Sequence, residues 1–244
     1  MPAASPIAPD SHPFWVVALV TLLFACLARL MRGVSLSGAI AGGVVCIALY
    51  AAAGPGAFVM LILLFLLYWG ATRLGYQRKQ KLGTAEKKEG RTASQVLANV
   101  GVSAACAAAY RWHGNTVFLL AMCAALAEAA ADTVSSEIGQ TSSREARLIT
   151  NWRKVPAGTD GGISLAGTLA GAGAALLVTV AGVFTGFIDR PELLASFLAA
   201  FTGMICDSFL GATVEWRGLL NNNTVNFLGT LTAVIVVAVW RLLL

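Results

Sequence analysis

Long apolar stretches alternate with short polar ones along nearly the whole chain. Several of the apolar stretches reach the roughly 20 residues that a helix needs to cross a bilayer. Transmembrane β-strands would show strict alternation of apolar and polar residues, and no such pattern is visible. The sequence therefore predicts an all-α protein, a polytopic transmembrane helical bundle of about eight spans. The expected spans are residues 14–31, 35–53, 56–73, 92–111, 115–136, 161–186, 192–213 and 224–242.

The composition agrees with a membrane protein. Hydrophobic residues make up 57% of the chain and charged residues only 12%, whereas a soluble domain carries about twice that share of charge. Residues 1–13 lack the Lys or Arg that begins a secretory signal peptide. We therefore expect a disordered N-terminal tail over residues 1–13 and a single transmembrane domain over residues 14–244. The cysteines form no CxxC pair and lie in apolar segments, which argues against a disulfide framework or a metal cluster.

Basic residues gather in two loops, residues 74–91 and 137–160. Because Lys and Arg concentrate in cytoplasmic loops, we expect both loops to face the cytoplasm and both termini to lie outside. Membrane topology then accounts for the net charge of +5, so no nucleic-acid partner is expected. The expected location is an inner membrane of bacterial type.

Acidic and hydroxyl residues end the expected span 115–136, in the stretch "AEAAADTVSSEIG". Glu128 and Asp132 are one helical turn apart and share a face, while Glu137 is expected in a turn or a frayed helix end. A carboxylate inside a membrane segment costs about 2.5–3.5 kcal/mol on insertion scales. The two acids therefore need a cation or a water-filled cavity. The other polar-rich stretches map to the same side of the membrane.

Three helix starts resemble one another and indicate an internal repeat. They are "VSLSGAIAGG" from Val34, "ISLAGTLAGA" from Ile163 and "VNFLGTLTA" from Val225, and each has a polar residue followed by a glycine. Two of the preceding segments end in Asp and a hydroxyl residue, at Asp132 and at Asp207. We infer repeated helical hairpins that enter from one side, an arrangement that commonly frames a binding site.

The polar residues at these helix ends suggest phosphate chemistry. Mg²⁺ prefers oxygen ligands and usually bridges protein carboxylates to substrate phosphates. Helix N-termini bind anions, and in "GTDGGIS" either Thr159 or Asp160 is expected to cap the helix that begins there, with the following glycines exposing backbone N–H groups. The sequence contains neither a P-loop nor the protein-kinase motifs.

The motifs "GRTASQVLANVG", "ADTVSSEIG", "GTDGGISLAGT", "DSFLGATVE" and "NNNTVNFLGT" occur in the order of one known family. The sequence resembles the integral-membrane family, long labelled a domain of unknown function, that includes plant phytyl-phosphate kinase of the vitamin E pathway. The resemblance implies phosphoryl transfer from a nucleoside triphosphate, with CTP as one candidate, to an isoprenyl monophosphate. Asp160 departs from the usual Asn, and Glu215 from the usual Gln. The positions of this sequence that match the family motifs are Gln95, Asn99, Asp132, Ser136, Glu137, Thr159, Asp160, Gly161, Gly162, Asp207, Asn222 and Asn226.

These residues, together with what the resemblance implies, lead us to expect a Mg²⁺-dependent prenyl-phosphate kinase. Asp132, Asp207 and Glu137 are the expected catalytic residues, and Asp132, Asp160 and Asp207 the expected metal ligands. The expected partners are an isoprenyl phosphate, a nucleoside triphosphate and the lipid bilayer. The expected substrate-binding residues are Arg91, Gln95, Asn99, Thr133, Ser136, Lys154, Thr159, Gly161, Gly162, Ser208, Asn222 and Asn226.

Two alternatives use the same residues. Repeated hairpins and intramembrane carboxylates also describe a cation- or proton-coupled transporter, whose site would lie near the bilayer midplane. Glu128 is the one acid placed deep enough to favour that alternative. The other is cytidylyl transfer to a lipid phosphate, which would release pyrophosphate. The sequence does not determine the length of the prenyl chain, the choice between CTP and ATP, or the oligomeric state.

Overall fold

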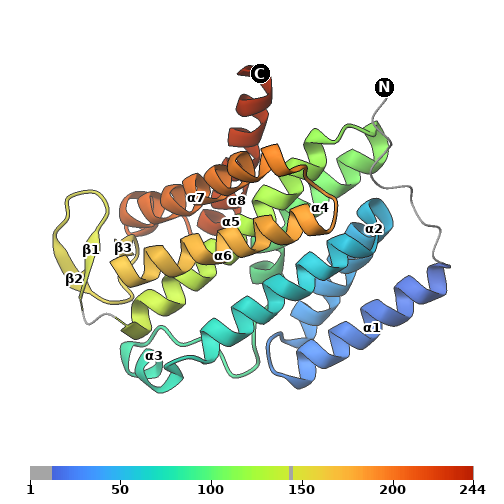
Figure 1. Ribbon diagram of the computed structural model, residues 1–244. Helices are drawn as coiled ribbons and strands as arrows, with labels where there is room; N and C mark the ends of the chain where they lie inside the picture. Colours follow the sequence, from blue (N-terminus) through green and yellow to red (C-terminus); the bar gives the residue numbers. More distant parts are fainter. Residues whose placement is uncertain (1–12, 143–144, 244) are drawn as a thin grey trace.

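The computed structural model describes residues 13–142 and 145–243, and helices make up 77% of it. The all-α class and the helical bundle are therefore confirmed (Figure 1). The expected disordered tail lies outside the described residues, apart from Pro13. The helices are α1 Phe14–Leu30, α2 Leu36–Arg73, α3 Tyr76–Leu82, α4 Ala93–His113, α5 Val117–Ser142, α6 Leu165–Phe184, α7 Leu193–Leu210 and α8 Asn222–Leu243, with a 3₁₀ turn Arg190–Glu192 and a π-helical turn Gly211–Glu215.

Helix α2 contains two of the predicted spans and folds back on itself. Its 38 residues are interrupted at Gly54, where φ is 75° and ψ is −170°, and Pro55 follows with no backbone N–H to continue the helix. The two ends of α2 consequently lie side by side. The Tyr68 hydroxyl donates to the Gly33 carbonyl at 3.1 Å, and Trp69 Nε1 donates to the Met31 carbonyl at 3.2 Å. The halves thus form an antiparallel hairpin.

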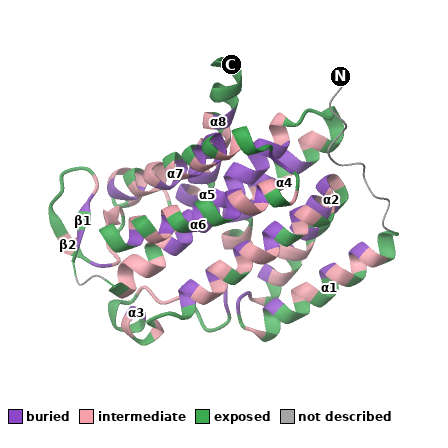
Figure 2. Cartoon of the chain, viewed as in Figure 1, coloured by how far each residue is buried: buried purple, intermediate pink, exposed green. Residues whose placement is uncertain are grey.

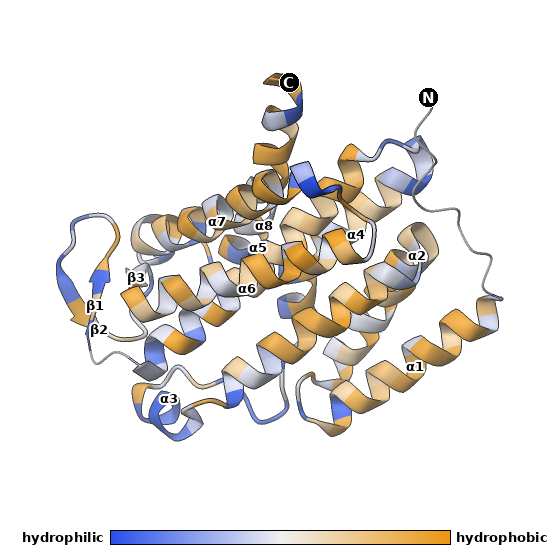
Figure 3. Ribbon diagram, viewed as in Figure 1, coloured by the Kyte–Doolittle hydropathy of each residue, from blue (hydrophilic) through white to orange (hydrophobic). Residues whose placement is uncertain are grey.

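Five helical segments of the described chain are long and apolar enough to cross a membrane, one of them the whole of α2. Counting α2 as two spans and adding the shorter α1 and the less apolar α4 gives the eight predicted segments. Figure 3 shows apolar residues along most of each helix, with hydrophilic residues gathered around α3, β1 and β2. The polar turns therefore lie together at one end of the bundle, as predicted.

Helix α5 forms the centre of the bundle and contacts α2, α4, α6, α7 and α8. Figure 2 shows it buried along most of its length. Its alanines allow neighbouring helices to approach closely. A Cβ added at Gly171 of α6 would lie only 2.7 Å from the Ala131 carbonyl oxygen of α5. By contrast, large apolar side chains such as Phe184 and Leu242 are exposed at the periphery, where lipid would surround them.

A small antiparallel sheet follows α5 and was not predicted. Its strands are β1 Glu145–Leu148, β2 Lys154–Pro156 and β3 Gly162–Ile163, in the order β2-β1-β3. The predicted helix boundaries on either side were wrong: α5 continues to Ser142, and the next helix, α6, begins only at Leu165. The physical reason is that Gly162 and Ile163 pair with β1, so their backbone is extended.

Candidate functional site

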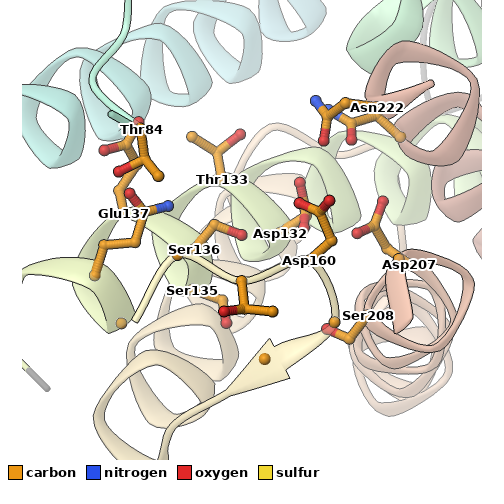
Figure 4. Close-up of a pocket in the computed structure, with 18 of the residues that line it drawn as sticks. Thr84, Asp132, Thr133, Ser135, Ser136, Glu137, Asp160, Asp207, Ser208 and Asn222 are labelled. Carbon is orange, nitrogen blue, oxygen red and sulfur yellow. The ribbon is translucent and has the colours of Figure 1, made fainter. Parts of the chain in front are cut away.

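A cavity of about 420 Å³ opens at the polar end of the bundle. Figure 4 shows side chains of α5, α7, α8 and the loops pointing into it. Apart from Lys154, every predicted site residue lines this cavity. The predicted residues that it brings together are Arg91, Gln95, Asn99, Asp132, Thr133, Ser136, Glu137, Thr159, Asp160, Gly161, Gly162, Asp207, Ser208, Asn222 and Asn226.

Two aspartates face each other across the cavity. Asp132 comes from α5 and Asp207 from α7, and Figure 4 shows both carboxyl groups pointing to the same space. Asp207 Oδ2 is buried and has no hydrogen-bond partner among the described residues. Two carboxylates this close repel each other unless a proton or a cation lies between them. The pair is therefore suited to a bound cation.

The donor atoms around this pair fit Mg²⁺. Carboxylate, hydroxyl and amide oxygens line the cavity, and Mg²⁺ takes oxygen ligands while keeping several waters. Within the described ranges, no three His, Cys, Asp or Glu side chains are arranged around one point. A magnesium ion would thus be held by one or two carboxylates, with water or substrate phosphate completing its shell.

Asp160 lies in a tight turn that packs on the π-helical turn Gly211–Glu215 after α7. The Gly162 N–H donates to the Thr159 carbonyl at 2.8 Å, and Gly161 has φ +69°. A Cβ at Gly161 would come within 2.3 Å of the Ala212 Cβ, so only glycine fits there. Burial raises the pKa of Asp160 above its ordinary value. The turn therefore brings a further carboxyl group to the cavity (Figure 4).

The same turn corrects the predicted helix cap. Thr159 and Asp160 do not cap α6, because four residues separate Asp160 from the first residue of the helix by way of β3. Ser164 is the N-cap instead, and its hydroxyl accepts from the Gly167 N–H at 3.1 Å. Gly161 and Gly162 thus line the cavity from a turn and a strand rather than from a helix N-terminus.

Helix N-termini still face the cavity. Asn222 is the first residue of α8, and Asn226 lies one turn further on. Gln95 belongs to the capping box of α4, where its Oε1 accepts from the Thr92 N–H at 2.8 Å. Because a helix N-terminus carries a partial positive charge, both starts favour an anion in the cavity.

Arg91 supplies a positive charge in a fixed orientation. Its guanidinium lies 4.0 Å from the centre of the Tyr68 ring, and its Nη2 donates to Thr133 Oγ1 at 3.1 Å. Its Nε lies 3.8 Å from Glu86 Oε2. The planar guanidinium is thus held on the cavity wall beside the Asp132 helix. Such a group binds phosphate well because its donors are already oriented.

Glu137 was predicted to lie in a turn or a frayed end, but it is part of α5 and paired with a buried lysine. Lys79 is fully buried, and its Nζ lies 2.5 Å from Glu137 Oε2. The ammonium also donates to the carbonyls of Ala71 at 3.0 Å and Thr72 at 2.7 Å. Glu137 therefore lines the cavity as the partner of a neutralising cation.

Lys154 is the predicted residue that the structure places elsewhere. It lies on the exposed strand β2, where its Nζ is 2.8 Å from Glu145 Oε2. Sequence reasoning instead missed Glu86 and Lys87, which line the cavity. Both were interpreted as part of a basic topology-determining loop. Their position beside "GRTASQVLAN" was the signal that could have identified them.

Glu128 does not line the cavity but lies one turn of α5 deeper in the bundle than Asp132. Its side chain is 1% exposed, and its Oε1 has no hydrogen-bond partner in the described part of the chain. A Cβ at Gly203 of α7 would lie 2.6 Å from its Cγ, and one at Gly229 of α8 would lie 2.6 Å from its Oε1. The glycines of two helices thus make room for this deep carboxyl group.

Comparison with known proteins identifies the family. Residues 19–234 match the family described as "Integral membrane protein DUF92". The chain belongs to the DUF92 family. The family predicted from the motifs, which includes plant phytyl-phosphate kinase, is thereby confirmed. The chain is an integral membrane protein.

Several curated proteins are similar to this DUF92 chain. It is 30% identical to the chloroplastic protein VTE6 of Arabidopsis thaliana, over 96% of this chain and 75% of VTE6. It is 33% identical to an uncharacterised membrane protein of Synechocystis, over 76% of each chain. A membrane protein of Methanocaldococcus jannaschii is 32% identical over 93% of this chain and 95% of its own length. No solved structure gives a significant match.

Proposed function

We propose that this DUF92 protein is a Mg²⁺-dependent prenyl-phosphate kinase. One observation carries the proposal: a cavity at the polar end of a membrane bundle holds two neighbouring aspartates, one with a buried oxygen that no described residue satisfies, beside an oriented arginine and two helix N-termini. Metal-binding and phosphate-binding groups are therefore adjacent. The membership of plant phytyl-phosphate kinase in the same family supports this assignment.

The residues divide into two functional groups. Asp132 and Asp207 would hold Mg²⁺, which when bound neutralises the charge that develops on the transferred phosphoryl group. Arg91 and Lys87, with the α8 start at Asn222, bind and orient the phosphates of the two substrates. Phosphoryl transfer requires little beyond such positioning and charge neutralisation.

The reaction needs no general base. An oxygen of the prenyl monophosphate attacks the terminal phosphorus of the nucleoside triphosphate, and the bond to the nucleoside diphosphate breaks. Since the second pKa of a phosphate monoester is about 6, the attacking oxygen is already ionised at neutral pH. This chemistry agrees with the pairing of Glu137 and Lys79, because a carboxylate neutralised by a buried lysine is poorly suited to take up a proton.

The direct test is a product assay with purified protein. Mg²⁺, CTP or ATP, and geranylgeranyl or phytyl phosphate are expected to give the prenyl diphosphate and a nucleoside diphosphate. Release of pyrophosphate with a cytidylylated lipid would instead identify a cytidylyltransferase. If no prenyl phosphate is turned over with any nucleoside triphosphate, the kinase proposal is wrong.

Glu128 is deeply buried, and its Oε1 has no hydrogen-bond partner among the described residues, which keeps transport as the second candidate function. A transporter needs a site near the midplane that both sides can reach, whereas the cavity opens at the polar end. Flux into liposomes that requires Glu128 and no nucleotide would favour the transporter. For the kinase we propose an inner membrane of bacterial type, with the cavity facing the cytoplasm, since the basic loops surround it.

A further inference from the structure

A second, apolar groove lies next to the polar cavity. It is formed between α1, both halves of α2 and the first half of α4, and has a volume of about 90 Å³. Four small residues of α2 line this space. A Cβ added at one of them, Gly42, would meet no atom within 4 Å. These four residues are Gly38, Ala39, Gly42 and Gly43.

The groove and the cavity meet at two shared residues. Arg91 and Asn99 line both spaces. Arg91 thus lies at the junction, with its guanidinium 4.0 Å from the centre of the Tyr68 ring, and Tyr68 itself lines the groove. An anionic group at Arg91 would therefore leave an attached apolar chain directly beside the groove. This combination of a cation at one end and an apolar channel behind it complements a lipid phosphate.

We propose that this groove binds the part of the prenyl chain nearest the phosphate, with the phosphate at Arg91. The inference rests on the proposed function, since it takes a prenyl monophosphate as the substrate. The groove is too small for a whole long prenyl chain, so the remaining carbons extend into the bilayer. Only the first carbons are then recognised by the protein.

The groove contributes by orienting the prenyl phosphate rather than by binding it more tightly. A chain that moves from lipid tails into an apolar groove gains little hydrophobic free energy, because both surroundings are apolar. Holding the first carbons instead fixes the direction from which the phosphate enters the cavity. Misplacing a reacting group by about 1 Å costs roughly 100-fold in rate, so a blocked groove should lower turnover of the prenyl substrate.

The substitution Gly42→Phe tests the proposal, because a Cβ at this position meets no atom within 4 Å and the ring beyond it would occupy the groove. We expect kcat/KM for geranylgeranyl phosphate to fall about 10- to 100-fold while KM for the nucleotide stays unchanged. Gly173→Phe is the matched control: a Cβ at this exposed α6 glycine also meets nothing within 4 Å, and Gly173 lines neither the groove nor the cavity. This variant should behave like the wild type.

A labelling experiment on the wild-type protein gives an answer that does not depend on turnover. A prenyl phosphate that carries a diazirine on a carbon near the phosphate should label residues 38–45, 61–68 or 96–100. Excess unlabelled prenyl phosphate should abolish this labelling, and an equal amount of phosphatidylglycerol should not.

The outcomes separate the two proposals. Full activity of Gly42→Phe on the prenyl substrate would overturn the groove proposal and leave the kinase proposal standing. If these segments are not labelled, the groove proposal is also wrong. It is equally wrong if phosphatidylglycerol displaces the label as well as prenyl phosphate does, because an ordinary bilayer lipid then occupies the groove. Specific labelling of the groove by a protein without kinase activity supports the groove and refutes the kinase.

Discussion

At the scale of single residues, the charges in the site differ in how they are neutralised. Glu137 is matched by Lys79 in a buried ion pair, and Arg91 is held by Tyr68, Thr133 and Glu86. Asp207 has a carboxylate oxygen that no described residue satisfies. The unsatisfied oxygen of Asp207 is therefore suited to a cation, and the paired groups are better suited to shaping the cavity.

The aspartate pair should be essential for turnover and not for folding. Asp132→Asn and Asp207→Asn keep the side-chain shape but remove a metal-binding charge. We expect each to lower kcat at least 100-fold, a size typical of lost electrostatic stabilisation, while the thermal unfolding temperature in detergent stays equal or rises. Prenyl-diphosphate formation and a thermal shift measurement check both parts. Full activity in both variants would show that the metal assignment is wrong.

Lys79 and Glu137 should depend on each other for stability. Lys79→Met leaves a largely buried carboxylate without its partner, which typically costs about 3–5 kcal/mol. The double variant Lys79→Met with Glu137→Gln removes both charges and should recover most of that loss. Unfolding of the single and double variants in a double-mutant cycle measures the coupling.

The same double variant tests whether Glu137 takes part in the chemistry. Because the proposed reaction needs no base, the double variant should keep a kcat within about 10-fold of the wild type. Removal of a true general base typically lowers kcat by about 100- to 10,000-fold. If kcat fell several hundredfold in a correctly folded double variant, Glu137 would have to be a catalytic residue after all.

At the scale of helices, the glycines of the predicted repeat mark close contacts. A Cβ at Gly38, Gly167 or Gly229 would lie 2.0, 2.6 or 2.6 Å from an atom of another segment. Ser35 and Ser164 also cap their helices identically, each accepting from the N–H three residues on at 3.1 Å. The third copy differs, because α8 begins at Asn222, four residues before the equivalent position. The repeat is thus a packing device as well as a capping motif.

Gly38→Ala should impair both stability and turnover. The added Cβ would lie 2.0 Å from the Arg91 carbonyl oxygen, so the Arg91 backbone must move. Overpacking of this kind costs about 1–3 kcal/mol, and displacement of Arg91 should lower kcat/KM for the prenyl phosphate. Gly173→Ala, which meets nothing within 4 Å, is the control. Equal behaviour of the two variants in thermal unfolding and turnover would contradict the contact.

At the scale of the whole molecule, the bundle gathers several acidic side chains around one cavity at its polar end, where the basic loops also lie. The cavity draws residues from α4, α5, α7, α8 and the loops between them, so its net charge is set by parts of the chain far apart in sequence. Asp160 enters this site through the turn between β2 and β3. The local environment there disfavours its charged form.

Asp160 should make stability depend on pH. Since burial raises its pKa in the folded protein, the folded state binds a proton that the unfolded chain releases, and stability falls as pH rises through the folded-state pKa. The variant Asp160→Asn lacks this contribution. Its advantage in unfolding temperature over the wild type should be absent near pH 3 and grow as pH rises toward 7, measured in EDTA. A constant difference at all pH values would contradict the shift.

The sequence by itself determined the fold class, the positions of the helical spans, the single polar end and the family. These properties follow from hydrophobicity, length and local motifs, which act within one segment. Nearly all of the site residues that it predicted line one cavity, because the motifs lie at or near helix ends on the same side. Lys154 was the exception, since its charge is matched by Glu145 on a strand that no local pattern revealed.

Only the tertiary structure decided which charges meet. The Lys79–Glu137 pair, the turn that places Asp160, the deep position of Glu128 between two glycines and the apolar groove behind Arg91 all join segments that are distant in the chain. Their geometry depends on how helices pack, and packing is a property of surfaces that face each other in space. Residue types and their spacing therefore predicted what chemistry is present, and the packed bundle determined where each group acts.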